Sequence, residues 1–162
     1  MNEQSFSITI ETNLPDADWA QVNGFLEDAN AAAGFPRNAQ VFTALLRNPN
    51  GGIEGGIRAH AFWDWMYVAA VAVARPWRGL GYGRQLLSRA EVWGRESCGC
   101  HSAWLMTMSF QAGRFYEAAG YERFAELPLF PEGSSRLFLR KSLRDSVFYR
   151  REAEFERTEK AE

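Results

Sequence analysis

Short apolar runs, amphipathic stretches and clusters of turn residues follow one another along the 162 residues of this chain. Alternating or wholly apolar runs that end at glycine, proline or asparagine predict strands, and apolar residues three or four positions apart predict helices. Strands are expected at 6–11, 41–47, 53–62, 66–73, 101–108, 121–126 and 135–140. Helices are expected at 16–33, as one helix or two, and at 82–94 and 111–119. This order predicts a single mixed α/β (α+β) domain.

The stretch 71–84 is the most informative part of the chain. An apolar strand pattern stops at a proline, a glycine-rich turn follows, and an amphipathic helix begins at once. Glycines let a ligand approach the backbone and its N–H groups closely, and the helix dipole adds roughly half a positive charge at the first turn. Arg78 adds a full positive charge. The pattern therefore predicts a site for a phosphate or pyrophosphate group.

Three kinds of phosphate-binding turn can be compared with this stretch. A P-loop requires a Lys-Ser or Lys-Thr pair after its glycines, and none follows here. A Rossmann turn requires an acidic residue about twenty positions downstream, and the run 101–108 contains none. The third kind, Arg-x-x-Gly-x-Gly, is satisfied by Arg78, Gly81 and Gly83. It is the pyrophosphate signature of the GNAT N-acetyltransferase superfamily, which this chain resembles.

The stretch 109–121 resembles the second motif of the same family, a short helix that carries a tyrosine and ends in Gly-Phe or Gly-Tyr. Gly120 is suited to a left-handed helix cap, and Ser109 to an N-cap. Tyr116 is expected to point partly away from the apolar side of this helix, which consists of Ala112, Phe115 and Ala119. With the strands around the two motifs, the resemblance covers most of residues 5–141.

The resemblance implies the GNAT fold, with a mixed central sheet of about seven strands flanked by about four helices. The domain is expected at 1–141, followed by a charged tail at 142–162 that is helical or partly disordered. The alternative for the tail is a helix that packs on its own domain or on a second subunit. The resemblance also implies that the chain can form a homodimer, although no residue demonstrates it.

The resemblance implies that acetyl-coenzyme A donates an acetyl group to an amine, with the backbone of Val71 and Val73 binding the pantetheine amides. The other cofactor-binding residues that it implies are Arg78, Gly79, Leu80, Gly81, Tyr82, Gly83, Arg84 and Ser109, the last where the family often has asparagine. Tyr116 matches the family's general acid. A phenol with a pKa near 10 is protonated at neutral pH and can donate a proton to the departing thiolate.

No general base can be named from the sequence. Many relatives carry a carboxylate in the strand before the turn, at the position that Ala69 occupies here. The remaining candidates are Glu54, His60 and Asp64, and a chain of water molecules to solvent would also suffice.

The acceptor is expected to be a small amine with an apolar or aromatic body. The chain lacks the several carboxylates that a polyamine pocket would present, and offers aromatic side chains instead: Phe35, Phe42, Trp63, Trp65 and Tyr67. Two other functions stay open: acetylation of a protein or peptide amine, and binding of an acyl-coenzyme A without turnover.

Composition removes several other classes of protein. A formal net charge of −2 argues against a general nucleic-acid binder, and no apolar run approaches the roughly twenty residues of a membrane span. The N-terminus lacks the features of a secretion signal, so the expected compartment is the cytoplasm. Cys98, Cys100 and His101 lie close together, but a structural zinc site usually needs four ligands. We therefore expect reduced thiols and no metal.

Overall fold

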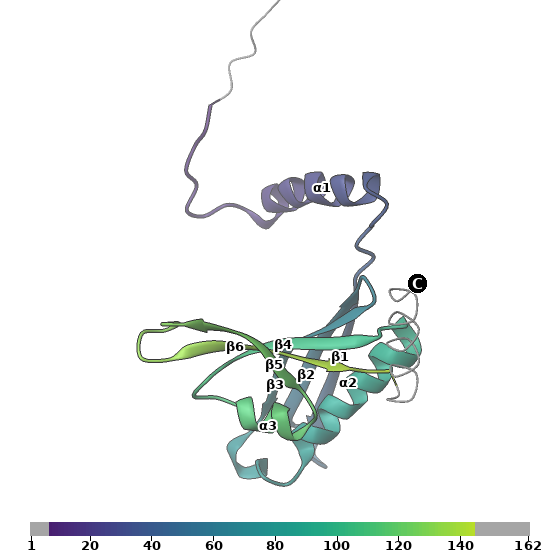
Figure 1. The fold of residues 1–162 in the computed structure, drawn as a ribbon, viewed down its shortest axis with the longest axis vertical. Coiled ribbons are helices and arrows are strands. Elements are labelled where there is room, and N and C mark those ends of the chain that lie inside the picture. The colour runs from purple at the N-terminus through teal and green to yellow at the C-terminus, as the bar shows by residue number, and fades with distance from the viewer. Residues whose placement is uncertain (1–6, 145–162) are drawn as a thin grey trace, which may run out of the picture. The chain divides into compact units, whose positions relative to one another are not determined.

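The computed structural model describes residues 7–144, which form three α-helices, a short 3₁₀ helix and six strands (Figure 1). The chain divides into two compact units, Met1–Arg37 and Asn38–Glu162. The second unit contains the whole sheet and both motifs singled out above.

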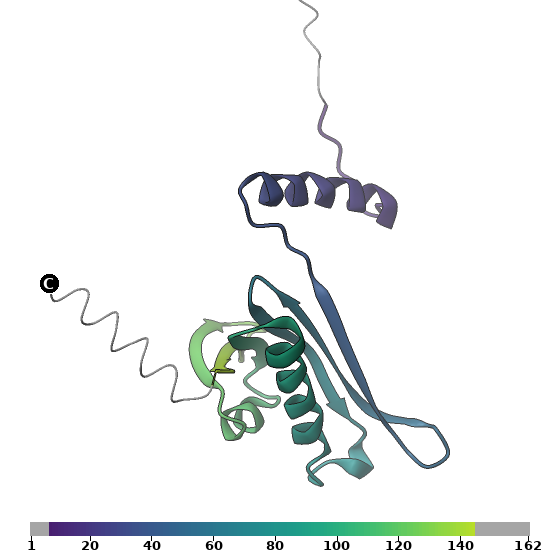
Figure 2. The ribbon, with the colours of Figure 1, turned by 90° about the vertical axis from the view of Figure 1, so that its right-hand side faces the viewer.

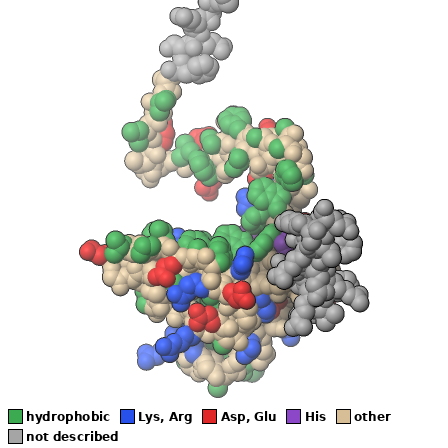
Figure 3. All heavy atoms as spheres, in the orientation of Figure 1, with side chains coloured by type: hydrophobic (Ala, Val, Ile, Leu, Met, Phe, Trp, Pro, Cys, Tyr) green, Lys and Arg blue, Asp and Glu red, His purple; other side chains and the backbone are tan. Residues whose placement is uncertain are grey.

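The first unit contains helix α1 (Asp16–Ala32). Asp16 and Asp18 lie in its first turn, where negative charge interacts favourably with the helix dipole. No side chain of α1 is buried, and its hydrophobic residues stand on the surface (Figure 3): Trp19, Val22, Phe25 and Leu26. The single helix matches the helical pattern predicted at 16–33.

The strand predicted at 6–11 is wrong for the residues that the structure describes. Residues 7–11 form no strand, and the side chains of Ile8 and Ile10 are almost fully exposed. An alternating pattern forms a strand only when a neighbouring strand pairs with it, and β1 at the sheet edge pairs with β2 alone. The described residues therefore hold six strands instead of about seven, and three α-helices instead of about four.

The sheet of the second unit has the strand order β1-β2-β3-β4-β6-β5. Its strands are β1 (Gln40–Arg47), β2 (Ile53–Phe62), β3 (Trp65–Val73), β4 (Ser102–Met108), β5 (Glu122–Pro128) and β6 (Ser135–Ser142). Only β3 and β4 are parallel, and the other neighbours are antiparallel. Each of these strands lies within two residues of its predicted bounds.

Helix α2 (Tyr82–Cys98) connects the two parallel strands and lies along one face of the sheet (Figure 2). Its buried positions are Leu86, Leu87, Ala90 and Gly94. Gly94 permits a very close approach, because a Cβ atom there would lie 2.9 Å from the Met66 sulfur. The core thus forms between α2 and the central strands.

Helix α3 (Gly113–Ala118) is shorter than the helix predicted at 111–119. Its N-cap is Ala112, so the expectation that Ser109 caps this helix is wrong. Gly120 follows the helix with a φ of +90°, as the cap prediction required.

The C-terminal part of the described chain remains packed on the sheet. Strand β6 runs to Ser142, and Leu143 is buried with its N–H donating to the His101 carbonyl. The rest of the predicted tail, 145–162, lies outside the described residues.

Candidate active site

The two parallel strands separate partway along their length. Strand β3 pairs with β4 only from Trp65–Ser102 to Val68–Leu105, although both strands continue beyond this point. On the other side of β3, the register with β2 shifts so that Arg58 pairs with Ala70 and Ala59 pairs with Val68. Ala69 is therefore the extra residue of a β-bulge, which bends the strand and ends its pairing with β4.

The bulge changes which side chains of β3 face the core. Met66 and Val68 are buried beneath α2, and Val71 and Val73 pack against the same core. On a regular strand, side chains alternate between the two faces, so Val71 and Val73 would face away from the side of Met66 and Val68. The one extra residue of the bulge places all four side chains on the same face. The far half of β3 thereby keeps its apolar side inward while it diverges from β4.

The backbone of the diverging segment presents Val71 and Val73 to the gap. The Ala74 N–H donates to the Glu54 carbonyl at 2.7 Å, and a Cβ atom on Gly55 would lie 2.7 Å from the Ala72 carbonyl oxygen. The N–H and C=O groups of Ala72 and Ala74 thus face β2. Since these groups alternate along a strand, the N–H and C=O groups of Val71 and Val73 face away from β2. The Arg78 Nε donates to the Val73 carbonyl at 2.9 Å.

The glycine turn leads directly into α2. Gly79 and Gly81 have φ values of +76° and +85°, a region that favours glycine. Gly81 is the N-cap residue of α2, and no side chain caps its first turn. The N–H groups of this turn, together with the helix dipole, make the loop an anion-binding arrangement.

These elements meet around a cavity of about 800 Å³. Eight of the ten predicted cofactor-binding residues line it: Val71, Val73, Arg78, Gly79, Gly81, Tyr82, Gly83 and Arg84. Leu80 and Ser109 are not among the lining residues, and Leu80 is 59% exposed. The Arg84 guanidinium also donates to the Ala118 carbonyl at 3.0 Å, which connects the start of α2 to the end of α3.

Two aromatic residues of the cavity wall, Trp77 and Phe110, were not predicted from the sequence. Each directly precedes or follows a residue that was singled out, Arg78 and Ser109 respectively. Trp77 ends the short 3₁₀ helix Arg75–Trp77 and Phe110 lies in a turn, so neither belongs to a periodic pattern and only this adjacency gave a signal.

Tyr116 lines the cavity from α3. Its side chain is only 7% exposed, and its ring makes edge-to-face contacts with Phe115 and Tyr121, at centroid distances of 4.9 and 5.9 Å. The expectation that it points partly away from the apolar side is wrong, because α3 turns this residue toward the core. Burial raises the pKa of the Tyr116 phenol, so the group keeps its proton well beyond neutral pH.

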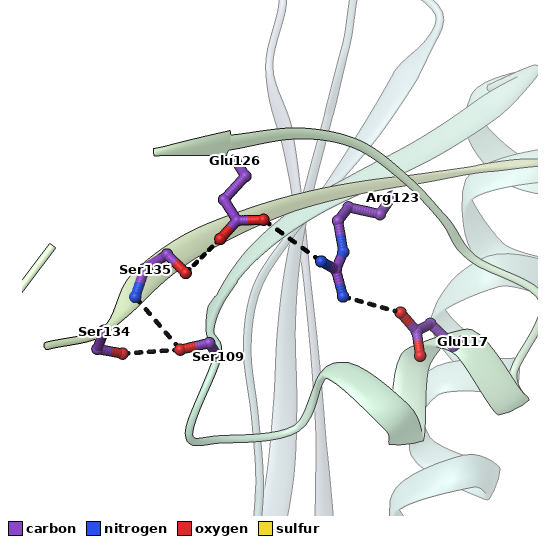
Figure 4. A network of polar contacts seen from close by, with 6 residues as sticks. All are labelled: Ser109, Glu117, Arg123, Glu126, Ser134 and Ser135. Atoms are coloured by element: carbon purple, nitrogen blue, oxygen red, sulfur yellow. Dashed lines mark hydrogen bonds and ion pairs between the residues drawn. The ribbon is translucent and has the colours of Figure 1, made fainter. Parts of the chain in front are cut away.

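Ser109 belongs to a polar network beside α3 (Figure 4). Its hydroxyl lies 2.8 Å from the Ser134 hydroxyl and accepts a hydrogen bond from the Ser135 N–H. The Ser135 hydroxyl donates to Glu126. Arg123 then bridges Glu126 and Glu117, the latter on α3, at 3.3 and 3.4 Å. Ser109 thus anchors the β5–β6 hairpin.

None of the three candidate bases lines the cavity. Glu54 accepts a hydrogen bond from the Asn48 side chain at 2.8 Å. The His60 ring lies 6.3 Å from the Tyr67 ring, and Asp64 lies in the turn between β2 and β3. Ala69, the position at which the resemblance implies a carboxylate in many GNAT proteins, is the bulge residue.

The candidate acceptor-side aromatic residues occupy separate places. Phe42 stacks on Trp93 of α2 at 5.2 Å, and Phe35 belongs to the first unit. Tyr67 packs on Trp104 at 4.5 Å. Trp63 and Trp65 line a second cavity of about 260 Å³ together with Phe62, Trp104, Phe124 and Arg140.

The two cysteines are free thiols, and burial raises the pKa of Cys100 to about 11. Within residues 7–144, no three His, Cys, Asp or Glu side chains are grouped so that they could hold a metal ion. In the same part of the chain, no helix has the length and apolar character needed to cross a membrane.

The family model of the GNAT acetyltransferases matches residues 11–121. This chain therefore belongs to the GNAT family of acetyltransferases. Blasticidin-S acetyltransferase of Streptomyces morookaense is 35% identical over 107 residues, which cover 66% of this chain and 79% of that protein.

Solved structures have the same fold. An acetyltransferase from Bacillus cereus superposes with a TM-score of 0.72 at 24% identity, covering 83% of this chain and 97% of that chain. A Bacillus anthracis protein assigned as a streptothricin acetyltransferase, solved in complex with acetyl coenzyme A, gives a TM-score of 0.54 at 23% identity. That match covers 65% of this chain and 62% of the other. At these identities the two matches establish the fold alone.

Proposed function

We propose that this protein transfers the acetyl group of acetyl-coenzyme A to a primary amine of a small molecule, by direct attack within a ternary complex. One observation carries the proposal. The diverging edge of β3, the uncapped glycine turn and the buried Tyr116 all line one cavity of about 800 Å³. Such a cavity is large enough for much of an extended, drug-sized ligand.

The lining residues suit the chemical groups of the coenzyme. A diphosphate is bound by N–H groups at the start of α2 and by the positive charge of Arg78. The pantetheine amides pair with the backbone of Val71 and Val73, as a strand adds to an exposed edge. Because Arg78 already donates to the Val73 carbonyl, Val73 contributes its N–H and Val71 contributes both of its backbone groups.

The bound coenzyme supplies an acyl group that is activated as a thioester. The amine attacks in its uncharged form, and Tyr116 holds the proton that the departing sulfur needs. Since burial raises the pKa of Tyr116, the phenol is fully protonated at neutral pH and acts as a general acid. The amine nitrogen bonds to the acyl carbon as the C–S bond breaks, the sulfur takes the proton of Tyr116, and the proton that the amine releases passes through water and restores the phenol. No carboxylate is among the residues that line the cavity in the described chain, so no side chain there is given the role of base.

A small-molecule acceptor is supported by the similarity to blasticidin-S acetyltransferase, whose name specifies such a substrate. The absence of a carboxylate from the described cavity wall supports a second candidate, a module that binds acyl-coenzyme A without turnover.

Two measurements separate these functions. Calorimetry with acetyl-coenzyme A tests binding, and a thiol-release assay over a panel of amines, with blasticidin S included, tests turnover. Transfer to one or more small amines supports the enzyme. Binding without thiol release on any amine or peptide supports the module, and no binding at millimolar coenzyme refutes both.

A further inference from the structure

A cluster of charged and aromatic side chains lies behind the candidate active site and outside its cavity. Glu91 of α2 forms an ion pair with Lys141 of β6, at 2.7 Å between Oε2 and Nζ. Both side chains are largely buried, at 15% and 26% exposed. The Lys141 ammonium also lies over the ring of Tyr121, 5.6 Å from its centroid, and Tyr121 is 3% exposed.

Two atoms of this cluster are buried without a hydrogen-bond partner among the described residues, Glu91 Oε1 and the Tyr121 hydroxyl. The two groups are nevertheless close enough to interact. Burial and then the negative charge of Glu91 raise the pKa of Tyr121 and keep its phenol neutral. A hydrogen-bonding interaction with the Glu91 carboxylate, outside strict hydrogen-bond geometry, adds to this shift. A buried ion pair adds little net stability of its own, so the effect of Glu91 and Lys141 to be tested is on the position of the groups that they contact, which include Tyr121.

Tyr121 is in direct contact with Tyr116. The Tyr121 N–H donates to the Tyr116 carbonyl at 3.0 Å, and the two rings meet edge to face at 5.9 Å. Gly120, with its φ of +90°, turns the chain back so that this contact forms directly after α3. The Tyr116 ring also meets the Phe115 ring edge to face, at a centroid distance of 4.9 Å. Tyr121 therefore forms the inner wall against which the Tyr116 ring lies.

We propose that Tyr121 is a positioning residue for Tyr116, and that the Glu91–Lys141 ion pair holds Tyr121 in place. The proposal rests on the role of Tyr116 as the proton donor. The edge-to-face contact fixes the angle of the Tyr116 ring and keeps water from its inner side. The ammonium of Lys141 lies against the face of the Tyr121 ring and limits its rotation.

Other charged groups around the two tyrosines come from every neighbouring element. Glu91 and Arg84 lie on α2, Glu117 on α3, Arg123 on β5 and Lys141 on β6. Among them only Glu91 is a cause of the pKa shift of Tyr121, and the shift of Tyr116 results from burial alone. Since burial is the cause of the Tyr116 shift, greater exposure of this phenol to water should lower its pKa.

The first test compares Tyr121→Leu with Tyr121→Phe, which keeps the ring and serves as the matched control. Tyr121→Leu is expected to lower kcat about tenfold with the KM for acetyl-coenzyme A within about twofold, because only the proton donor is misplaced. Water reaches Tyr116 in this variant, so the alkaline fall of kcat moves to lower pH. Tyr121→Phe is expected to retain both properties. Wild-type kcat and pH profile in Tyr121→Leu would overturn the proposal.

The second test leaves the aromatic core intact. The double variant Glu91→Gln/Lys141→Met removes both charges, so that neither remains buried alone. We expect kcat to fall about threefold at an unchanged KM and an unchanged or higher melting temperature. A purely structural ion pair would instead leave kcat at the wild-type value and lower the melting temperature, and this result overturns the role given to the pair.

A third readout does not depend on turnover. In protein with tyrosines labelled at Cζ, the NMR signal of Tyr116 is identified among the five tyrosines by its loss in Tyr116→Phe. Tyr121→Leu should shift this signal and lower its titration midpoint, whereas Tyr121→Phe should not. If the wild-type protein transfers no acetyl group, the proposed function fails. If it does, and the Tyr116 signal is unchanged in Tyr121→Leu, the positioning role alone fails.

Discussion

The two sides of the candidate active site are built in different ways. The phosphate side comes from one continuous segment, in which β3, the glycine turn and the start of α2 follow each other within residues 71–84. The Tyr116 side is assembled from distant parts of the chain, since α3, Tyr121, β6 and α2 all contribute to the surroundings of one phenol. A local segment sets its geometry by backbone conformation, whereas an assembled site depends on packing. The two sides should therefore respond differently to substitution.

The largest effect on kcat is expected at the Tyr116 side. Tyr116→Phe removes only the hydroxyl, so coenzyme binding should be retained while kcat falls about a hundredfold, the low end of what general acid catalysis contributes. Steady-state kinetics and calorimetry with acetyl-coenzyme A measure the two quantities. An unchanged kcat would remove Tyr116 from the chemistry.

The next largest effect is a loss of coenzyme affinity at the phosphate side, where backbone conformation sets the geometry. Gly81→Val places a branched side chain at a φ of +85° and should weaken acetyl-coenzyme A binding by about thirtyfold. The matched control is Gly99→Val, which places the same side chain at a φ of +69° outside the cavity wall. Calorimetry should show near wild-type affinity for the control. Equal losses in both variants would contradict the conformational explanation.

Substitutions of Arg78 test how its charge and its hydrogen bond contribute to coenzyme binding at the phosphate side. Arg78→Met removes the charge and the Nε bond to Val73, and should raise the KM for acetyl-coenzyme A about tenfold with little change in kcat. Arg78→Lys keeps the charge and should recover part of this loss. If kcat falls as much as kcat/KM, Arg78 also acts in the chemical step.

The pH dependence of kcat tests the Tyr116 side of the site. The general acid acts only while protonated, so activity is lost as pH rises through the pKa of Tyr116. Because burial raises this pKa, the alkaline fall of kcat should begin above pH about 10, the ordinary value for tyrosine. Tyr116→Phe should lack this fall. A fall centred below pH 9 or so in the wild-type protein would contradict the buried phenol.

The smallest effect is expected at Ser109. Ser109→Ala removes the hydroxyl contacts to Ser134 and Ser135 but no group of the cavity wall, so the KM for acetyl-coenzyme A should stay within about twofold. Stability should fall by about 1 kcal/mol, the usual net value of a hydrogen bond. Chemical denaturation measures this change. A large rise in KM with unchanged stability would instead return Ser109 to the coenzyme site.

The same contrast explains how much the sequence could predict. Segments whose signal is local were predicted well, including the bounds of β2, the start of α2 and the left-handed turn at Gly120. The prediction that Ser109 caps α3 failed, because its hydroxyl pairs with Ser134, far along the chain. The predicted orientation of Tyr116 failed because this side chain joins a core that several other elements supply. The strand predicted at 6–11 failed for the same reason, since its alternating pattern requires a pairing partner that the sequence does not identify.

The bulge at Ala69 makes the length of β3 as important as its composition. Deletion of the extra residue would restore regular alternation with the two valines still facing the core, but it would remove the bend that separates β3 from β4, and insertion of a further residue would direct the valines outward. Point substitutions among the small apolar residues of this strand leave that count intact. Over evolution, insertions and deletions in β3 should therefore be selected against more strongly than exchanges of one residue for another.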